Sequence, residues 1–306
     1  MAASCRPSGR LYPLPDELIL TDLSQGQKPR PRAMDSLLSK LPPLVLLLAF
    51  LGIWIWEWLQ AARPGKRDWR RGRRNLVISV LGIAAGGLTA GALLALSSTV
   101  EANHWGMAAL GLPFWITLVA GILLLDLADY WRHRISHAVP LLWRLHRVHH
   151  SDPQMDVTTS LRSHPLEAAL RPAFLGTAIL ALGIPPLPVT LYPVIQLPVL
   201  IFQHANVALP KQVDSLLAWL IATPAMHVVH HSRWMPETNS NYSTFLTLWD
   251  RIFGSFRPSV LPRGIGLDGY DDEHSQTVLG LLLEPLRNRP TAAGVRIEPS
   301  ADEAAN

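Results

Sequence analysis

The sequence predicts an all-α integral membrane protein, a helical bundle of about four hydrophobic passes that carries a cytoplasmic, histidine-rich helical cap. Only 16% of the 306 residues are charged and 49% are hydrophobic, whereas a soluble chain carries about 25% charged residues. Several apolar runs approach the ~20 residues that a helix needs to cross a bilayer. Twelve histidines are present, and most of them lie in short, regularly spaced boxes.

The first 36 residues are rich in Pro, Arg, Lys and Ser and show no sustained periodicity, which predicts a disordered tail. They lack the order of a signal peptide. Met34 directly precedes the first hydrophobic span and is an alternative translation start. The single cysteine, Cys5, excludes a disulfide framework and a thiolate-rich metal cluster.

Residues 37–110 are predicted to form a transmembrane hairpin. Its first span, 41–58, ends in three tryptophans typical of an interfacial aromatic belt. Its second span, 76–96, has no charge and contains glycines that allow close helix packing in lipid. Seven of the 27 basic residues lie between the spans, in the stretch 63–74. Because the neighbouring runs have membrane length, this cluster indicates a cytoplasmic loop rather than a nucleic-acid-binding surface.

A third span starts at Phe114 and continues into the segment that holds the first histidine box. The proline-interrupted stretch 168–202 is long enough for two passes, and Pro185–Pro188 could be the turn of that hairpin. Since 97–112 contains no Lys or Arg, the positive-inside rule predicts that the histidine boxes lie on the cytoplasmic side. The short apolar segment 278–283 is expected to pack against the histidine-rich part.

Eight histidines form one HxxxH box and two HxxHH boxes. Residues three and four apart share a helix face, so each box is expected to present its imidazoles in one direction, as metal binding requires. The eight ligand candidates are His133, His137, His146, His149, His150, His227, His230 and His231. Imidazole suits Zn, Cu, Fe and Ni. Because eight nitrogens exceed the four that a tetrahedral zinc takes, the boxes indicate two metal ions with open positions.

The boxes and their flanks resemble the fatty acid hydroxylase/sterol desaturase superfamily of membrane-bound di-iron oxygenases. The resemblance covers about residues 110–258, so 111–258 is expected to be the catalytic domain and 259–306 a polar C-terminal tail. Ser243 departs from the pattern, since the family commonly has Gly after Asn-Tyr. The resemblance rests on the segments Asp129–His133, Trp143–Ser151, Arg162–Glu167, Gln203–Asn206, Thr223–His227 and Asn241–Phe256.

This resemblance implies that the three boxes bind two iron ions and that His204 is an additional ligand. His164 lies in a second family segment and is expected to be either an orienting or a structural residue. Three further polar residues are candidates for orienting the ligands through hydrogen bonds. They are Asp129, four residues before His133, and Asn241 and Asp250, which lie in an otherwise apolar and aromatic segment.

The resemblance further implies an O2-dependent enzyme that hydroxylates or desaturates a C–H bond of a membrane lipid. Electrons are then expected from a separate donor of the ferredoxin or cytochrome b5 type. Arg132, Arg134, Arg144 and Arg147 could form its docking surface or could bind lipid head groups and nearby acids. Two other classes remain open at this point, a zinc-dependent membrane hydrolase and a metal transporter or sensor. HExxH is absent, so the general base of a zinc protease is missing.

Overall fold

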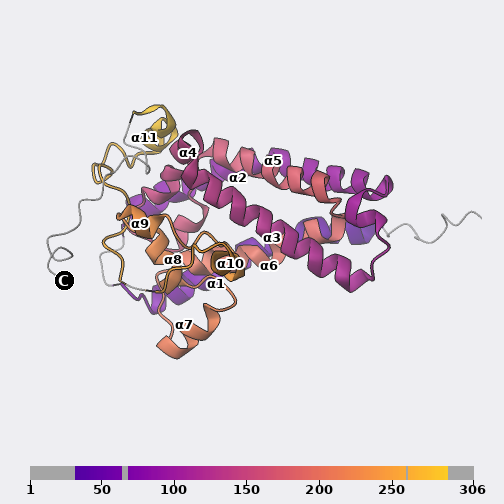
Figure 1. The fold of residues 1–306 in the computed structure, drawn as a ribbon. Helices are drawn as coiled ribbons and strands as arrows, with labels where there is room; N and C mark the ends of the chain where they lie inside the picture. Colours follow the sequence, from indigo (N-terminus) through magenta and orange to yellow (C-terminus); the bar gives the residue numbers. More distant parts are fainter. Residues whose placement is uncertain (1–31, 64–67, 260, 289–306) are drawn as a thin grey trace, which may run out of the picture. The chain divides into compact units, whose positions relative to one another are not determined.

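A computed structural model of the chain describes residues 32–63, 68–259 and 261–288 (Figure 1). Most of the predicted N-terminal tail and the last 18 residues, 289–306, therefore lie outside the described residues. The chain divides into two units, residues 1–37 and 38–306, and the first contributes only the start of α1 to the described part. In the second unit the described residues form helices and three isolated bridges but no strand, which confirms the all-α prediction.

Five helices are long and apolar enough to cross a membrane. The number is one more than the expected four or so, and the hairpin expected in the stretch 168–202 is present as two helices. The five are α1 (Arg32–Leu59), α2 (Trp69–Ala102), α3 (Phe114–Ala138), α5 (Pro165–Leu182) and α6 (Pro186–His204). The chain is thus a multi-pass membrane protein.

Gly183 makes the turn between α5 and α6. Its φ of 67° lies in the left-handed region, which a glycine adopts without steric cost. A Cβ atom at this position would lie 2.1 Å from the carbonyl oxygen of Trp105, in the loop after α2. Only glycine therefore allows this turn to touch the loop between α2 and α3, and both connections lie at the same end of the bundle.

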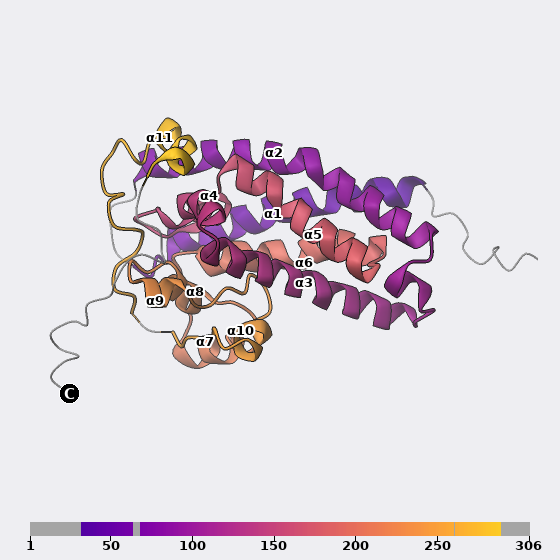
Figure 2. The same cartoon turned by 45° about the horizontal axis from the view of Figure 1, so that its top comes forward.

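Most of the shorter elements gather at the opposite end of the long helices. Figures 1 and 2 show α4, α8, α9 and α11 at this end, with α7 and α10 beside it. The short elements of this end are α4 (Pro140–His150), η2 (Val157–Leu161), α7 (Lys211–Leu217), α8 (Pro224–His230), α9 (Met235–Thr238), α10 (Leu248–Ile252), α11 (Val278–Leu282) and η3 (Glu284–Leu286), whereas η1 (Gly106–Ala109) lies at the other end, against Gly183. We call the end that holds α4 and α8 the histidine end, because all three boxes lie in it.

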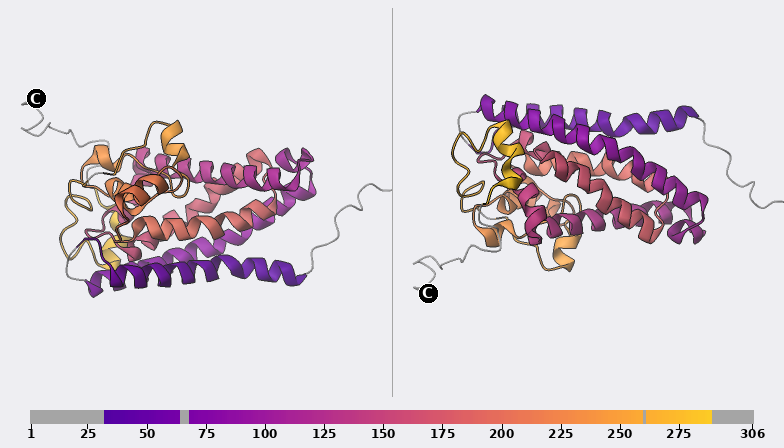
Figure 3. Two further views of the ribbon diagram at one scale, coloured as in Figure 1. Left: turned by 90° about the horizontal axis from the view of Figure 1, so that it is seen from below. Right: turned by 90° about the horizontal axis from the view of Figure 1, so that it is seen from above.

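Helix packing depends on small residues between α2 and α5. A Cβ added at Gly86 would come within 3.3 Å of the Ala168 carbonyl oxygen, so glycine permits the close approach. By contrast, α1 runs along one side of the bundle in both views of Figure 3. Its side chains Leu44, Leu48 and Ile55 are more than half exposed, as expected of a face that contacts lipid tails.

The C-terminal segment packs onto the histidine end. Leu281 of α11 is fully buried against Ile78 of α2 and Val148 of α4, as the sequence predicted for the segment 278–283. Nearby, the buried Arg147 forms an ion pair of 2.9 Å with Glu284. These contacts attach residues 278–286 to the helix that carries the second histidine box.

Candidate metal centre

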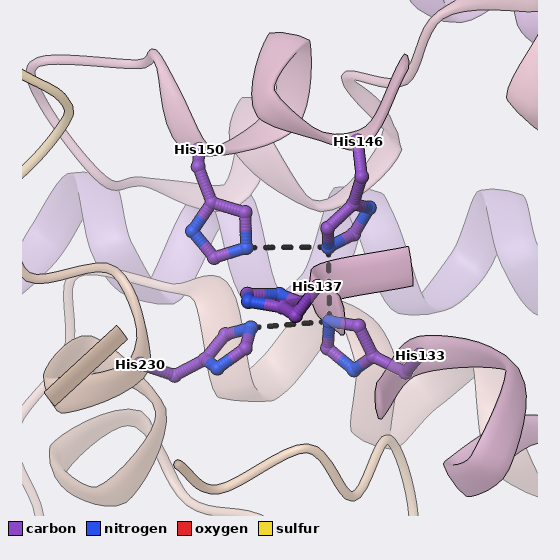
Figure 4. A group of neighbouring side chains, drawn as sticks. All are labelled: His133, His137, His146, His150 and His230. Carbon is purple, nitrogen blue, oxygen red and sulfur yellow. Dashed lines mark hydrogen bonds between the residues drawn. The ribbon is translucent and has the colours of Figure 1, made fainter. Parts of the chain in front are cut away.

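Nine buried histidines form two neighbouring groups in the histidine end. Within each group one ring nitrogen from every residue lies within 4.8 Å of the others. We call them the five-histidine group, shown in Figure 4, and the four-histidine group. The first consists of His133, His137, His146, His150 and His230. The second consists of His149, His204, His227 and His231.

Each HxxHH box is divided between the two groups, contrary to the expectation that a box points one way. His146 and His150 belong to the five-histidine group, whereas His149 belongs to the four-histidine group. The third box is divided in the opposite sense, because His227 and His231 join the four-histidine group and His230 the other. Successive residues differ by about 100° around a helix. Positions i and i+4 therefore nearly coincide, while i+3 lies on the other side of that direction.

The facing Nε2 atoms have the spacing of ligands around a common ion. His133 Nε2 lies 3.0 Å from His146 Nε2 and 3.1 Å from His230 Nε2. In the four-histidine group His204 Nε2 lies 3.1 Å from both His149 Nε2 and His227 Nε2. Nitrogens about 2.1 Å from one ion are about 3.0 Å apart at 90° and about 3.4 Å apart at the tetrahedral angle. The observed spacing fits ligands at right angles better than a tetrahedral site.

The outer nitrogens of six rings have hydrogen-bond partners on the protein. Carbonyl and carboxylate oxygens accept hydrogen bonds but cannot donate them. Each of these Nδ1 atoms therefore carries the proton, and Nε2 keeps the free electron pair that can bind a metal. Four rings donate to backbone carbonyls: His133 to Tyr242, His230 to Ser240, His149 to Arg162 and His204 to Leu200. The other two donate to side chains, His146 to the Glu167 carboxylate and His137 to the Asn239 side-chain oxygen.

Burial favours the neutral form of the five ligand candidates that lie at positions 149 and 150 and between 227 and 231. It lowers the pKa of His149, His150, His227, His230 and His231 well below the ordinary value for histidine, and the neighbouring imidazoles lower it further. Neutral imidazole is the form that binds metal. In addition, His137 Nε2 and His231 Nε2 are buried without a hydrogen-bond partner among the described residues. A metal ion in each group would satisfy them, so the donor set fits two ions.

Glu167 is a contact that the sequence reasoning missed. Its Oε1 atom accepts a hydrogen bond of 2.6 Å from His146 Nδ1, which places a carboxylate directly behind the five-histidine group. In the sequence it falls within the segment Arg162–Glu167, which carries part of the family resemblance. An acid in the first turn of an apolar membrane helix is a usable signal, because such residues are rare without a functional partner.

None of the four expected orienting residues contacts a ligand ring directly. Asp129 instead forms ion pairs with two arginines at once, Arg132 at 2.7 Å and Arg171 at 3.0 Å. Asp250 accepts the backbone N–H groups of Tyr242 and Ser243, and so acts on His133 only through the Tyr242 carbonyl.

The other two residues have backbone roles. Asn241, with a φ of 52°, donates to the Met226 and Arg257 carbonyls and holds the strained loop between α9 and α10. His164 caps the start of α5, where its Nδ1 atom accepts the Leu166 N–H at 3.1 Å. Its Nε2 atom lies 3.1 Å from the Leu282 carbonyl, which ties α5 to the C-terminal segment.

Two of the four arginines considered for a docking surface are buried instead. Arg147 is 1% exposed and Arg132 is 9% exposed, because each pairs with a buried acid, while Arg134 and Arg144 are half-buried. Arg134 donates to the Tyr130 hydroxyl and the Phe253 carbonyl. The predicted cytoplasmic cluster is also partly internal, since Arg71 forms buried ion pairs with Asp152 and Asp156.

A cavity of about 710 Å³ adjoins both histidine groups and extends between the long helices. His133 and His146 of one group and His149, His204 and His227 of the other contribute to its wall. Away from the histidines the wall is largely aliphatic, with residues from α1, α2, α5 and α6. The volume is that of a pocket for a lipid-sized apolar molecule, within the ~300–1,000 Å³ common for ligand sites.

Comparisons with known proteins identify the segment that carries this site. Residues 118–255 match the family model described as fatty acid hydroxylase. An alkylglycerol monooxygenase of Xenopus tropicalis is 31% identical over 147 residues, which are 47% of this chain and 30% of that protein. An ornithine lipid hydroxylase of Rhizobium tropici is 32% identical over 158 residues, 50% of this chain and 46% of that protein.

More distantly, cholesterol 25-hydroxylase of Homo sapiens is 26% identical over 144 residues, 46% of this chain and 51% of that protein. The chain thus spans between about a third and about a half of the length of these relatives. No solved structure matches it. The predicted resemblance to the fatty acid hydroxylase/sterol desaturase superfamily is confirmed for the segment that holds the histidine boxes.

Proposed function

We propose that this protein is an O2-dependent di-iron oxygenase that hydroxylates a C–H bond of a membrane lipid. The observation that carries the proposal is the opening of two buried histidine groups onto one lipid-sized apolar cavity. The relatives named above support it, because their names describe hydroxylases and a monooxygenase that act on lipids. We propose hydroxylation in preference to desaturation for the same reason.

The proposed ligands are the five histidines of one group and the four of the other. A metal with six positions keeps at least one open in the first group and two in the second. When bound, two reduced irons would supply the activation of O2 that an unactivated C–H bond requires. The right-angled nitrogen spacing supports iron over tetrahedral zinc, and no observation favours a zinc hydrolase or a transporter.

The chain's own residues prepare the site for this chemistry. The Glu167 carboxylate holds the proton of His146 on Nδ1 and adds the negative charge that nine neutral rings lack. Asp250 fixes the Tyr242 carbonyl that holds the proton of His133. The aliphatic cavity wall excludes water and aligns an alkyl chain beside the rings.

We also propose that the histidine end faces the cytoplasm. In the described part of this end Arg63 precedes α2 and Arg70 and Arg71 lie in its first turn, whereas the segment 97–112 at the other end has no Lys or Arg. Electrons would come from a separate cytoplasmic protein of the ferredoxin or cytochrome b5 type. Reporter fusions in the 62–74 loop and at the C terminus should both report the cytoplasm, and opposite locations would contradict this orientation.

The function is tested with iron-loaded full-length protein in lipid nanodiscs, supplied with a ferredoxin–reductase pair, total lipid extract and labelled O2. We expect a lipid product about 16 mass units heavier with ordinary O2 and about 18 units heavier with 18O2. A product 2 units lighter would indicate desaturation. Turnover without O2, or with zinc alone, would contradict the proposal. His104→Ala is the control, because His104 is exposed in the loop at the opposite end and belongs to neither group.

A further inference from the structure

Several hydrogen-bond donors in the cavity wall have no partner among the described residues, and Gln196 and Gln203 both carry one. Gln196 of α6 is 1% exposed, and its Nε2 atom makes no hydrogen bond. Arg171 of α5 uses Nε and one terminal nitrogen for Asp129, and that same nitrogen contacts Gln196 Oε1 at 3.4 Å. Its second terminal nitrogen is left without a partner in this part of the chain, and the side chain is 29% exposed. We call Arg171 and Gln196 the donor pair.

A buried donor without an acceptor is costly, and a bound ligand removes that cost. The pair supplies N–H groups, and the neighbouring carboxylate, Asp129, already accepts from both Arg132 and Arg171. The complementary ligand atom is therefore an oxygen that accepts hydrogen bonds, such as an ether, ester or hydroxyl oxygen of a lipid.

The donor pair lies close to the histidines. Arg171 is four residues after Glu167, whose carboxylate holds His146, and Asp129 is four residues before His133. Four residues are one helical turn, about 5–6 Å along the axis. Arg171 is thus roughly one turn deeper in the bundle than the contact of Glu167 with His146, and Gln196 is two turns before His204 on α6.

Toward the histidines the cavity wall also holds Gln203 and the Glu167 Oε2 atom without partners among the described residues, whereas the part beyond the donor pair is largely aliphatic. Its deeper wall includes the aliphatic side chains of Ile83, Leu175, Ile179 and Val189. The two polar side chains of α6 in this region are already used, because Tyr192 donates to Asp126 and Thr190 to the Pro186 carbonyl. A long alkyl chain fits this part, whereas a second polar end does not.

We propose, on the basis of the function proposed above, that the donor pair binds an acceptor oxygen of the lipid substrate and so selects the carbon that is oxidised. The pair and the rings are separated by about one to two helical turns, which an alkyl chain spans in several bonds. The oxidised carbon therefore lies several bonds from a lipid oxygen, while the alkyl chain occupies the aliphatic part. A lipid whose only oxygen is at the far end of a long skeleton is a poor fit.

Binding tests this proposal without requiring turnover. Dissociation constants of the full-length protein in detergent are measured for tritiated n-hexadecane, hexadecyl methyl ether and hexadecan-1-ol. We expect the ether, which only accepts hydrogen bonds, and the alcohol to bind about three- to tenfold more tightly than the alkane. Equal affinity for the ether and the alkane would overturn the proposal. A second result would overturn it as well, namely that the alcohol binds more tightly than the alkane while the ether does not. Such a preference would require the lipid hydroxyl to donate a hydrogen bond, and N–H donors cannot accept one.

Gln196→Glu is the first variant, because it keeps the oxygen that faces Arg171, replaces the Nε2 donor with an acceptor oxygen and adds a negative charge. Gln196→Leu removes both the oxygen and the donor and serves as the second variant. Each should abolish most of the preference for the ether over the alkane, with the metal content unchanged. Thr177→Val, on the exposed outer face of α5, is the control and should keep the preference. An undiminished preference in both Gln196 variants would refute the donor pair.

The position of the product separates this proposal from the proposed function. If the enzyme inserts oxygen far from any oxygen of its substrate, the donor-pair proposal fails and the oxygenase proposal stands. If no O2-dependent product forms with any lipid but the binding preference follows Gln196, the oxygenase proposal fails and the donor pair remains a lipid-binding site.

Discussion

The two histidine groups differ in the hydrogen-bond partners of their outer ring nitrogens, those that face away from the proposed metal ions. In the five-histidine group His146 donates to the Glu167 carboxylate and His137 to the Asn239 side chain, while His133 and His230 donate to backbone carbonyls. The four-histidine group has only two carbonyl acceptors, those of Arg162 and Leu200. Outer partners orient a ligand ring and raise its basicity.

The difference indicates an unequal pair of metal sites. The five-histidine group has more ligands, more outer partners and a negative charge behind it, so it should bind its ion more tightly. In the four-histidine group the outer nitrogens of His227 and His231 have no partner among the described residues. Three of its four rings also reach the cavity wall, against two of five in the other group. The looser group is thus the better placed to adjust when a substrate binds.

The largest effect is expected from removing one ligand from each group in turn. His227→Ala and His230→Ala form a matched pair, because the two rings lie on α8 within one turn but belong to different groups. Since two metals act together, each variant should lower the proposed oxygenase activity by about a hundredfold or more. Metal analysis should show one ion lost in each case. Full occupancy and activity in either variant would refute the assignment of that ring.

Chelation should distinguish the two groups by their affinity. Stepwise addition of a chelator is expected to remove the ion of the four-histidine group first, so that the metal content passes through a plateau near one ion per chain. Complete removal should lower the melting temperature by about 5–10 °C, if the ions contribute about 2.7 kcal/mol. Simultaneous loss of both ions would show that the groups do not differ in affinity.

Glu167→Gln tests the contribution of charge to the stronger group. Glutamine keeps an oxygen acceptor for His146 Nδ1 but removes the negative charge, so the tautomer is retained. We expect metal affinity at the five-histidine group to fall by about 10- to 100-fold, measured by competition with a chelator, while the other group is unaffected. An equal loss from both groups would mean that Glu167 acts on the whole centre.

Asn239→Ala should give the smallest effect. Its hydrogen bond to His137 is neutral and 3.2 Å long, and such a bond contributes about 0.5–1.5 kcal/mol. The metal affinity of the five-histidine group should therefore fall only a few-fold by the same competition measurement. A loss as large as that of Glu167→Gln would show that ring orientation, rather than charge, distinguishes the groups.

The residues that the sequence alone placed correctly are those whose signal is local. Apolar runs predicted the long helices, since burial of about 20 apolar residues in lipid does not depend on their partners. The stretch 168–202 remained ambiguous between one pass and two, because its prolines are compatible with helix starts as well as helix breaks. Pro165 and Pro186 both stand at first turns, where a proline has no N–H to lose.

The sequence by itself determined that this is an all-helical membrane protein of the histidine-box type, with nine histidines as ligand candidates. Their division into two groups follows from the tertiary structure, because each group combines rings from helices that are far apart in the sequence, such as α4 and α8. Tertiary structure likewise decided that Asp129 serves two arginines and that Glu167 serves a histidine. The reason is physical: a carboxylate buried in a bundle takes its nearest cation or donor, and residues far apart in sequence decide which one that is.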